Sequence, residues 1–216
     1  MPSSTRDRIL EVSAALFQRQ GYNATGVKQI VTEARAPFGS VYHHFPGGKE
    51  EIGAAAVKVS GKLYEQLIPA VFDGAPDPVT GVRWFFAGAA AHLVETDYED
   101  ACPIATVTLE AANVSEPMRL ACASVYDSWI DAGATMFVER ANCDGSTARR
   151  LTIAMICALE GAFVLARAQR TTEPLEVAGE LMAHAVEREL MGSGAFGRLR
   201  AAEHRPMAAD GGVRSG

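Results

Sequence analysis

One stretch, from Thr25 to Lys49, constrains the fold of this chain more than any other: TGVKQIVTEARAPFGSVYHHFPGGK. Apolar residues recur at helical spacing over its first third, and Pro37 stands where a second short helix would begin. Val41 and Phe45 are four residues apart, so both would face the core from that second helix. Two short helices joined by a tight turn are the layout of a helix-turn-helix, whose second helix enters the major groove of DNA.

The flanking residues predict where these helices begin and end. Ser4 or Thr5 can cap a first helix that ends at Gly21, and Thr25 stands in the N-cap position of the second. A long fourth helix is expected to begin at Lys49, after the turn PGG. The sequence therefore predicts a three-helix head over residues 1–48.

The side of the third helix that does not face the core carries small, aromatic and hydrogen-bonding residues. A glycine there lets the backbone approach DNA, polar side chains can donate to phosphates or reach base edges, and a phenyl ring can contact a thymine methyl. Lys28, in the first turn of the second helix, can meet a phosphate. Alternatively, Tyr42 and one histidine only pack between helices. The candidate DNA-contacting residues of the third helix are Phe38, Gly39, Ser40, Tyr42, His43 and His44.

The two parts of the chain differ in net charge, which suggests that they have different functions. The net charge is -6, which by itself disfavours DNA binding. Residues 1–62, however, carry eight Lys/Arg against five Asp/Glu, whereas residues 63–216 carry twelve against twenty-one. A basic head on an acidic body would turn the head toward phosphates.

The remainder of the chain predicts a helical body and a tail. Helical periodicity continues over residues 49–192, whereas residues 193–216 are rich in Gly, Ala and Arg and are expected to be disordered. The most apolar run, Leu151–Ala166, is shorter than a membrane span and contains Glu160, so we interpret it as a buried helix. The polar start of the chain indicates no signal peptide, and we expect a cytoplasmic protein with reduced thiols.

The chain resembles the TetR/AcrR family of bacterial regulators, and the form APFGSVYHHFPGGKE resembles its LmrA/YxaF-type branch. The matching positions are Ile9-Leu10, Leu16-Phe17, Gly21-Tyr22, Thr25, Val27, Ile30, Ala34, Gly39-Ser40, Tyr42, His44-Phe45 and Lys49. The resemblance implies an all-α homodimer: each subunit has a helix-turn-helix head and a helical body for ligand binding and dimerisation. Thr25 and Lys28 would then be second-helix contacts and Lys49 a phosphate-binding lysine. The last two helices would form the subunit interface.

Two positions depart from the family pattern. Arg35 stands where the family usually has glycine in the turn, so a positive φ there would strain the backbone. Phe38 stands where Lys or Arg is frequent, which removes one phosphate or guanine contact. Both substitutions bear on the affinity and sequence preference for DNA.

Aromatic, methionine and charged side chains of the body could line a pocket for a hydrophobic or aromatic ligand. Helical spacing of such residues is also consistent with ordinary core packing. Glu160 could pair with Arg167 or another arginine across a dimer, or contact a cationic ligand. The candidate ligand-binding residues are Trp84, Phe86, His92, Met118, Trp129, Phe137, Met155, Glu160 and Phe163.

The sequence contains no pattern that indicates catalysis. The histidines and cysteines have no metal-ligand spacing, and there is no nucleophile elbow or dinucleotide motif. We therefore expect no cofactor and no enzymatic activity. The predicted function is a regulator, most simply a repressor, that a small ligand releases from an inverted-repeat operator. Two alternatives stay open: a small-molecule carrier or enzyme with a vestigial head, and a redox switch at Cys102, whose helix N-terminal position could lower its pKa.

Overall fold

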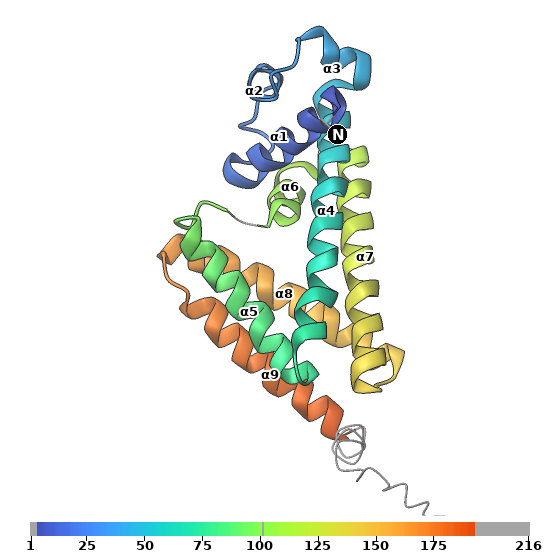
Figure 1. Ribbon diagram of the computed structural model, residues 1–216, viewed down its shortest axis with the longest axis vertical. Coiled ribbons are helices and arrows are strands. Elements are labelled where there is room, and N and C mark those ends of the chain that lie inside the picture. Colours follow the sequence, from blue (N-terminus) through green and yellow to red (C-terminus); the bar gives the residue numbers. More distant parts are fainter. Residues whose placement is uncertain (1–3, 101, 193–216) are drawn as a thin grey trace, which may run out of the picture.

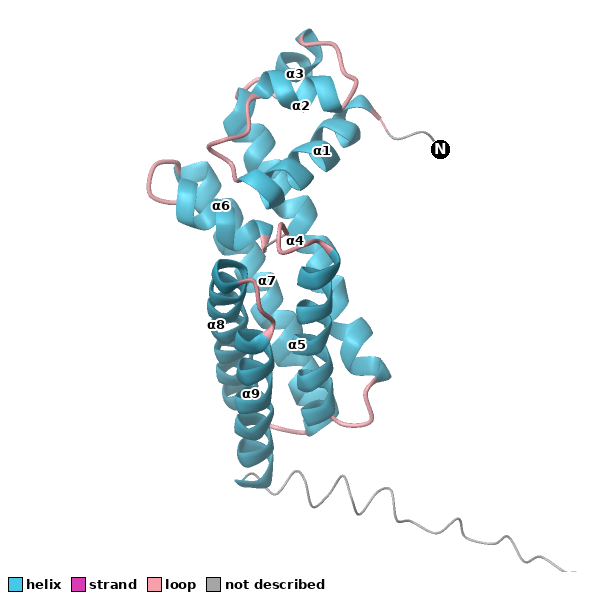
Figure 2. Ribbon diagram, turned by 90° about the vertical axis from the view of Figure 1, so that its left-hand side faces the viewer, coloured by secondary structure: helices cyan, strands magenta, loops and turns pink. Residues whose placement is uncertain are grey.

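The computed structural model describes residues 4–100 and 102–192, and over these residues every regular element is an α-helix (Figures 1 and 2). The predicted all-α fold is therefore confirmed. The helices are α1 Thr5–Gln20, α2 Val27–Glu33, α3 Gly39–His44, α4 Gly48–Gly74, α5 Pro78–Glu95, α6 Pro103–Ala111, α7 Glu116–Ala141, α8 Gly145–Gln169 and α9 Glu173–Gly192. The predicted tail, residues 193–216, lies outside the described residues.

The head consists of α1, α2 and α3, and local sequence signals account for most of its boundaries. The N-cap of α1 is Ser4, which forms a capping box with Asp7, and Gly21 ends the helix at a φ of 86°. Two predicted starts were wrong. The N-cap of α2 is Gly26 rather than Thr25, and α3 begins at Gly39, two residues after Pro37.

Helix α4 connects the head to the body. It runs from the head down the length of the molecule and packs most extensively against α7, which follows it on one side (Figure 1). At the lower end α5 packs on α9, α9 on α8, and α8 on α7. Because α4 belongs to both parts, a movement of its lower half is transmitted to the head.

Two hydrophobic clusters form the core. The upper cluster joins the head to the upper halves of α4 and α7 and to α6, and it includes Phe17, Phe45 and Met118. The lower cluster joins α5, α8, α9 and the lower half of α7, and it includes Phe86 and Phe137. The hydrophobic core of the head is therefore continuous with that of the body.

Glycines on α4 allow α7 to approach closely. A Cβ atom on Gly61 would lie 2.4 Å from Val125 Cγ1, and one on Gly53 would lie 2.8 Å from the Met118 sulfur. A side chain at Gly61 would overlap Val125, and one at Gly53 would require Met118 and Tyr22 to shift. The contact between the two helices thus depends on backbone-to-side-chain packing, which leaves little freedom for them to slide.

Candidate nucleic-acid interface

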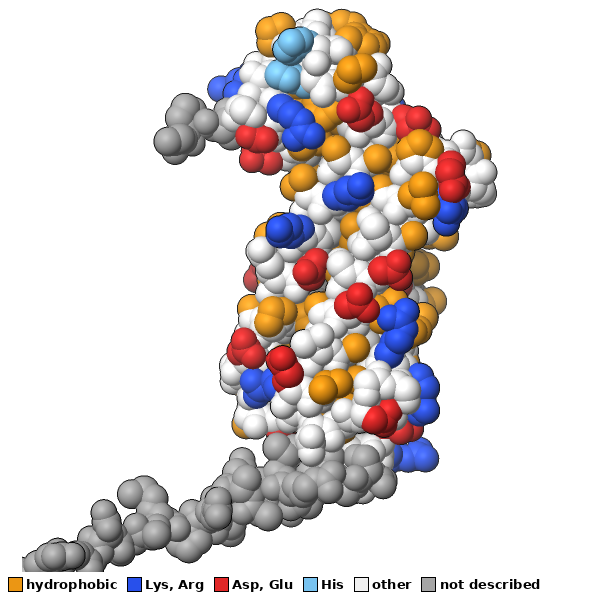
Figure 3. Space-filling view, turned by 90° about the vertical axis from the view of Figure 1, so that its right-hand side faces the viewer, with side chains coloured by type: hydrophobic (Ala, Val, Ile, Leu, Met, Phe, Trp, Pro, Cys, Tyr) orange, Lys and Arg blue, Asp and Glu red, His pale blue; other side chains and the backbone are white. Residues whose placement is uncertain are grey.

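The outer face of α3 is exposed at one end of the molecule. Val41 and Phe45 are fully buried beneath it, as the four-residue spacing predicts. Phe38 and Tyr42 are 54% and 56% exposed, and their rings meet edge to face with centroids 6.0 Å apart. Figure 3 shows histidine side chains at the same end, on the surface of the head.

The remaining α3 candidates also lie on this outer face. Gly39 and His43 are exposed, whereas Ser40 and His44 are half-buried. The exposure of the Tyr42 and His43 side chains argues against the alternative in which they only pack between helices. The face therefore offers two aromatic rings, imidazoles and a hydroxyl, all of which can contact base edges or phosphates.

The two candidates from the second helix are placed differently. Lys28 is exposed in the first turn of α2, where its ammonium group is free to meet a phosphate. Thr25 is fully buried: its Oγ1 donates to the Gly21 carbonyl at 2.7 Å and accepts from Gln20 Nε2 at 3.1 Å. The Thr25 side chain thus shapes the loop before α2 and, being buried, does not reach the outer surface of the head.

Lys49 is engaged within the protein. Its Nζ lies 4.3 Å from the centroid of the Tyr22 ring, a cation–π contact. Burial lowers the pKa of Lys49, while the nearby Glu110 carboxylate opposes that shift. A phosphate contact through Lys49 would have to compete with the Tyr22 ring.

Arg35 has the positive φ that would strain the backbone at a non-glycine residue. Its φ is 49°, in the left-handed region that glycine occupies at little cost. The side chain is exposed in the turn between α2 and α3, and no partner for it is seen within the described part of the chain. Among the described residues, therefore, no side-chain contact of Arg35 offsets the strain, although its backbone N–H donates to the Thr32 carbonyl at 3.2 Å.

Polar contacts tie the head to the body. Glu110, at the end of α6, accepts a hydrogen bond from the Asn23 backbone N–H at 2.7 Å. Gln18 of α1 donates to the Tyr64 hydroxyl of α4 at 3.2 Å, and the Ser115 hydroxyl donates to Glu50 at 2.6 Å. Each of these bonds joins segments that are far apart in the sequence, so together they set the orientation of the head.

The nine candidate ligand-binding residues do not converge on one site. Phe86, Phe137 and Met155 belong to the lower cluster, and Phe163 packs against it. Trp84 is 48% exposed. His92 is exposed too, with its Nε2 3.5 Å from Asp100. The other three candidates, Met118, Trp129 and Glu160, lie at the upper cluster or beside it.

Glu160 lies among polar and aromatic groups, and the sequence analysis identified only some of them. Its carboxyl group hydrogen-bonds with the Cys102 thiol and lies in the electrostatic surroundings of Tyr64 and Tyr126. We call Tyr64, Cys102, Tyr126, Trp129 and Glu160 the Glu160 cluster. The two tyrosines come from α4 and α7, and no sequence spacing relates them to Glu160 on α8.

Burial dominates the ionisation of the Glu160 cluster. Desolvation raises the pKa of Glu160, and the pKa of Tyr64 rises to about 12, also mainly by desolvation. Cys102 is buried, and burial together with the Glu160 carboxyl raises its pKa well above the ordinary value, which disfavours the redox alternative and favours a structural thiol. The thiol at this helix N-terminus stays protonated, which removes the basis for a redox switch there.

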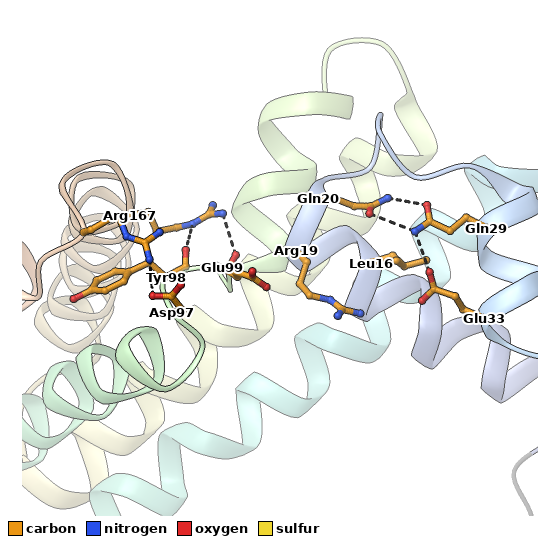
Figure 4. Close-up of a pocket in the computed structure, with 10 residues that line it drawn as sticks. Leu16, Arg19, Gln20, Gln29, Glu33, Asp97, Tyr98, Glu99 and Arg167 are labelled. Carbon is orange, nitrogen blue, oxygen red and sulfur yellow. Dashed lines mark hydrogen bonds and ion pairs between the residues drawn. The ribbon is translucent and has the colours of Figure 1, made fainter.

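Within the chain, Arg167 does not pair with Glu160. Its guanidinium donates to the backbone carbonyls of Tyr98 and Glu99, at 3.1 and 3.0 Å. It therefore holds the connection between α5 and α6. Arg167 also lines a polar cleft of about 530 Å³ between the head and the body (Figure 4).

This cleft differs in character from the predicted aromatic pocket. Its head side carries Gln20, Gln29 and Glu33, which bond to one another, and its body side carries Asp97 and Arg170, which form an ion pair. None of the nine candidate ligand-binding residues lines it. Among the described residues, no group of three His, Cys, Asp or Glu side chains could hold a metal ion.

Comparisons with known proteins agree with this geometry. Residues 9–56 match the model of the TetR family of bacterial regulatory proteins, and residues 78–181 match the C-terminal domain of LmrA/YxaF-like transcriptional regulators. The uncharacterized HTH-type transcriptional regulator YxaF of Bacillus subtilis is 36% identical over 176 residues, 82% of this chain and 92% of that protein. The HTH-type transcriptional regulator LmrA of the same organism is 32% identical, covering 79% and 90% of the two chains.

A solved structure supports the same fold. The regulatory protein TetR from Rhodobacter sphaeroides superposes with a TM-score of 0.73 at 23% identity, over 84% of this chain and 98% of that one. An all-helical body that carries a helix-turn-helix head defines a DNA-binding transcriptional regulator rather than an enzyme. The chain belongs to the TetR family, in its LmrA/YxaF-like branch.

One helix of the body, α8, is similar to a membrane span in length and composition. α8 is long and apolar enough to cross a bilayer, with a mean hydropathy of 1.8 over its most apolar window, of which 28% is buried in the chain. Length and composition alone are weak evidence for a single helix. In the structure one face of α8 packs on α7 and α9, and the other leaves apolar side chains uncovered.

Proposed function

We propose that this regulator is a cytoplasmic, homodimeric repressor that binds an inverted-repeat operator and is released by a small hydrophobic or aromatic ligand. The observation that carries the proposal is the pairing of an exposed recognition face on α3 with exposed apolar stripes on α8 and α9. A lone head of this size makes few contacts with DNA. Two heads at fixed separation read two half-sites about 34–36 Å apart.

The apolar stripes account for the dimer. On α8, Ile153, Val164 and Leu165 are exposed, and Leu165 is 54% exposed. On α9, Val177 and Leu181 are exposed one turn apart, and Leu181 is 64% exposed. Since α8 and α9 pack side by side, their stripes together would form the surface that a second copy covers in a four-helix bundle.

Four other apolar residues of α9 pack inside the subunit. Leu175 and Leu190 are fully buried in the lower cluster, and Ala178 and Met182 pack against it. Leu181, in contrast, faces outward. The apolar positions of α9 therefore divide between the subunit's own core and the proposed interface.

The head–body contacts support release by a ligand. A ligand that favours one arrangement of α4 and α6 alters the hydrogen bonds that Glu110 and Tyr64 make with the head, and so changes the separation of the two α3 helices. A repressor role also agrees with one relative's name. The HTH-type transcriptional repressor DhaR of Mycobacterium sp. is 23% identical over 79% of this chain.

The test is selection of random-sequence duplexes with the purified protein at near-physiological salt, followed by sequencing. Enrichment of an inverted repeat is the expected result, and its spacing gives the separation of the heads. Equal binding of selected and scrambled duplexes would contradict the proposal and favour a small-molecule carrier with a vestigial head. The selected operator then serves to screen ligands for release.

A further inference from the structure

The Phe38 ring stands outside the core of the head. It belongs neither to the upper cluster nor to the side chains packed against that cluster, and it is 54% exposed. Its backbone is already helical, with φ -55° and ψ -38°, so Phe38 and Tyr42 are four residues apart on the same face. Figure 3 shows hydrophobic side chains beside the histidines at this end of the molecule.

Tyr42 restricts the orientation of the Phe38 ring. The two rings meet edge to face, with centroids 6.0 Å apart and an interplanar angle of 61°. Tyr42 in turn lies beside the backbone of α4: its Cε1 is 3.9 Å from the position that a Cβ atom would take on Gly48. The pair is therefore ordered before any partner arrives, which reduces the entropic cost of a contact through Phe38.

Gly39, next to Phe38, is a glycine that the packing of the protein does not require. It is the first residue of α3, it does not have a positive φ, and a Cβ atom there would meet nothing within 4 Å. Glycine is a poor helix former, so its own helix gains nothing from it. Its missing side chain does allow an external partner to approach the backbone closely, directly beside the Phe38 ring.

The charges around the ring fit a polyanion as that partner. Between Glu33 and Glu50 the sequence contains no acidic residue. Lys28 and Arg35 are both exposed on the head. Phosphates can approach these cations while the Phe38 ring, which carries no charge, meets the base edges between them.

We propose that Phe38 determines specificity by contacting the C5-methyl group of a thymine in each operator half-site, with Tyr42 positioning its ring. In the major groove thymine alone presents an apolar group, so an apolar ring covered by base edges selects it. The inference rests on the proposed function, because it names a chemical group of the operator that the repressor reads.

The first test is a parallel selection from two random duplex pools, one made with thymine and one with uracil. Uracil lacks the C5-methyl group but keeps the base pairing and the hydrogen-bonding groups of the major groove. The wild-type protein is expected to enrich an inverted repeat from both pools. A thymine·adenine pair at one position of each half-site should be enriched strongly in the thymine pool and weakly in the uracil pool.

The second test replaces the thymines of the selected operator by uracil, one symmetric pair at a time. Loss of one methyl contact should weaken wild-type binding by about 4-fold per half-site, and by about 10- to 20-fold for the pair. In Phe38→Ala the same replacement should change the affinity by less than about 2-fold. A merely structural role of Phe38 would lower the affinity for both duplexes equally and leave the discrimination unchanged.

Three further variants serve as controls. Tyr42→Phe keeps the ring pair and removes only the hydroxyl, so it should preserve the discrimination between thymine and uracil. Leu63→Ala, at a leucine of α4 that is 62% exposed, should change neither the affinity nor the discrimination. Phe38→Lys exchanges the apolar ring for a cation. It should abolish the discrimination and steepen the salt dependence of binding by about 2 in log–log slope for the two heads together.

The outcomes separate this inference from the proposed function. An inverted repeat with the same consensus and affinity in both pools would overturn the thymine contact and leave the repressor standing. A uracil effect of equal size in the wild type and in Phe38→Ala would assign the methyl contact to another residue and overturn the role of Phe38. No enrichment from either pool would overturn both proposals.

Discussion

Polar side chains are arranged in opposite ways at the two ends of the upper cluster. At the tip, α3 turns its aromatic and hydrogen-bonding side chains outward and buries only Val41 and Phe45. Some distance below, the Glu160 cluster holds a carboxyl, a thiol and two tyrosine hydroxyls, all at most partly exposed, among apolar residues. An outward set of donors is suited to a large, polar and charged partner such as DNA. An enclosed set is suited to a small partner that must lose its water to enter.

This difference predicts at which positions a substitution changes function without changing stability. At the tip, function and packing are on opposite faces of one short helix. In the Glu160 cluster the polar side chains belong to the packing between helices. Substitutions on the outer face of α3 should therefore alter DNA binding with little effect on stability, whereas those in the cluster should alter stability as well.

The largest expected effect comes from breaking the proposed dimer. Leu165→Glu combined with Leu181→Glu places two charges per subunit on the exposed stripes of α8 and α9. The variant should be monomeric in light scattering and lose about 10²- to 10⁴-fold in operator affinity, because the second head no longer binds at high effective concentration. Leu63→Glu on α4, where the leucine is 62% exposed, is the matched control. A double variant that remains dimeric would place the interface elsewhere.

A pair of substitutions in the third helix tests the separation of faces directly. Phe45→Ala removes a fully buried ring and should lower the free energy of unfolding by about 3–5 kcal/mol. Tyr42→Ala, three residues earlier and exposed, should change stability by less than about 0.5 kcal/mol. It should nevertheless weaken operator binding by about 10-fold. Denaturant melts and binding curves measure both quantities, and a large loss of stability in Tyr42→Ala would show that this face also packs.

Substitutions at Arg35 extend this comparison to the turn between α2 and α3. Arg35→Gly should raise the free energy of unfolding by about 1 kcal/mol, because glycine adopts the observed φ of 49° without strain. Arg35→Ala removes the same charge but keeps the strain, so it should not stabilise the protein. Comparable stability of the two variants in thermal melts would show that the backbone is not strained there.

The smallest expected effect is a pH-dependent one at Glu160. Burial raises the pKa of this carboxyl in the folded protein. Its contribution to the free energy of unfolding is therefore greatest at low pH, where it is protonated in both states, and is lost as pH rises through the folded-state pKa. Glu160→Gln should stabilise the protein relative to the wild type more at pH 8 than at pH 5. Melting temperatures at the two pH values measure this, and an equal difference at both would mean that Glu160 is not desolvated.

The sequence alone was sufficient for the features that depend on neighbours in the chain. The all-α class, the first-helix cap at Ser4, the Gly21 stop and the burial of Val41 and Phe45 all follow from local patterns. Each depends on backbone preferences or on helical periodicity over a few residues. Such preferences act in the same way before and after the helices pack.

Only the tertiary structure decided which side chains from different helices meet. Thr25 looks like an N-cap by position, yet it is buried and bonded to Gly21. Cys102 does cap α6, but its pKa rises because Glu160, 58 positions away, and the surrounding core exclude water. Neither effect has a local signal, because burial and electrostatic contact are set by the packing of whole helices. The sequences of both the head and the body thus identify the family, whereas the chemistry of the body depends on contacts between helices that are far apart in the sequence.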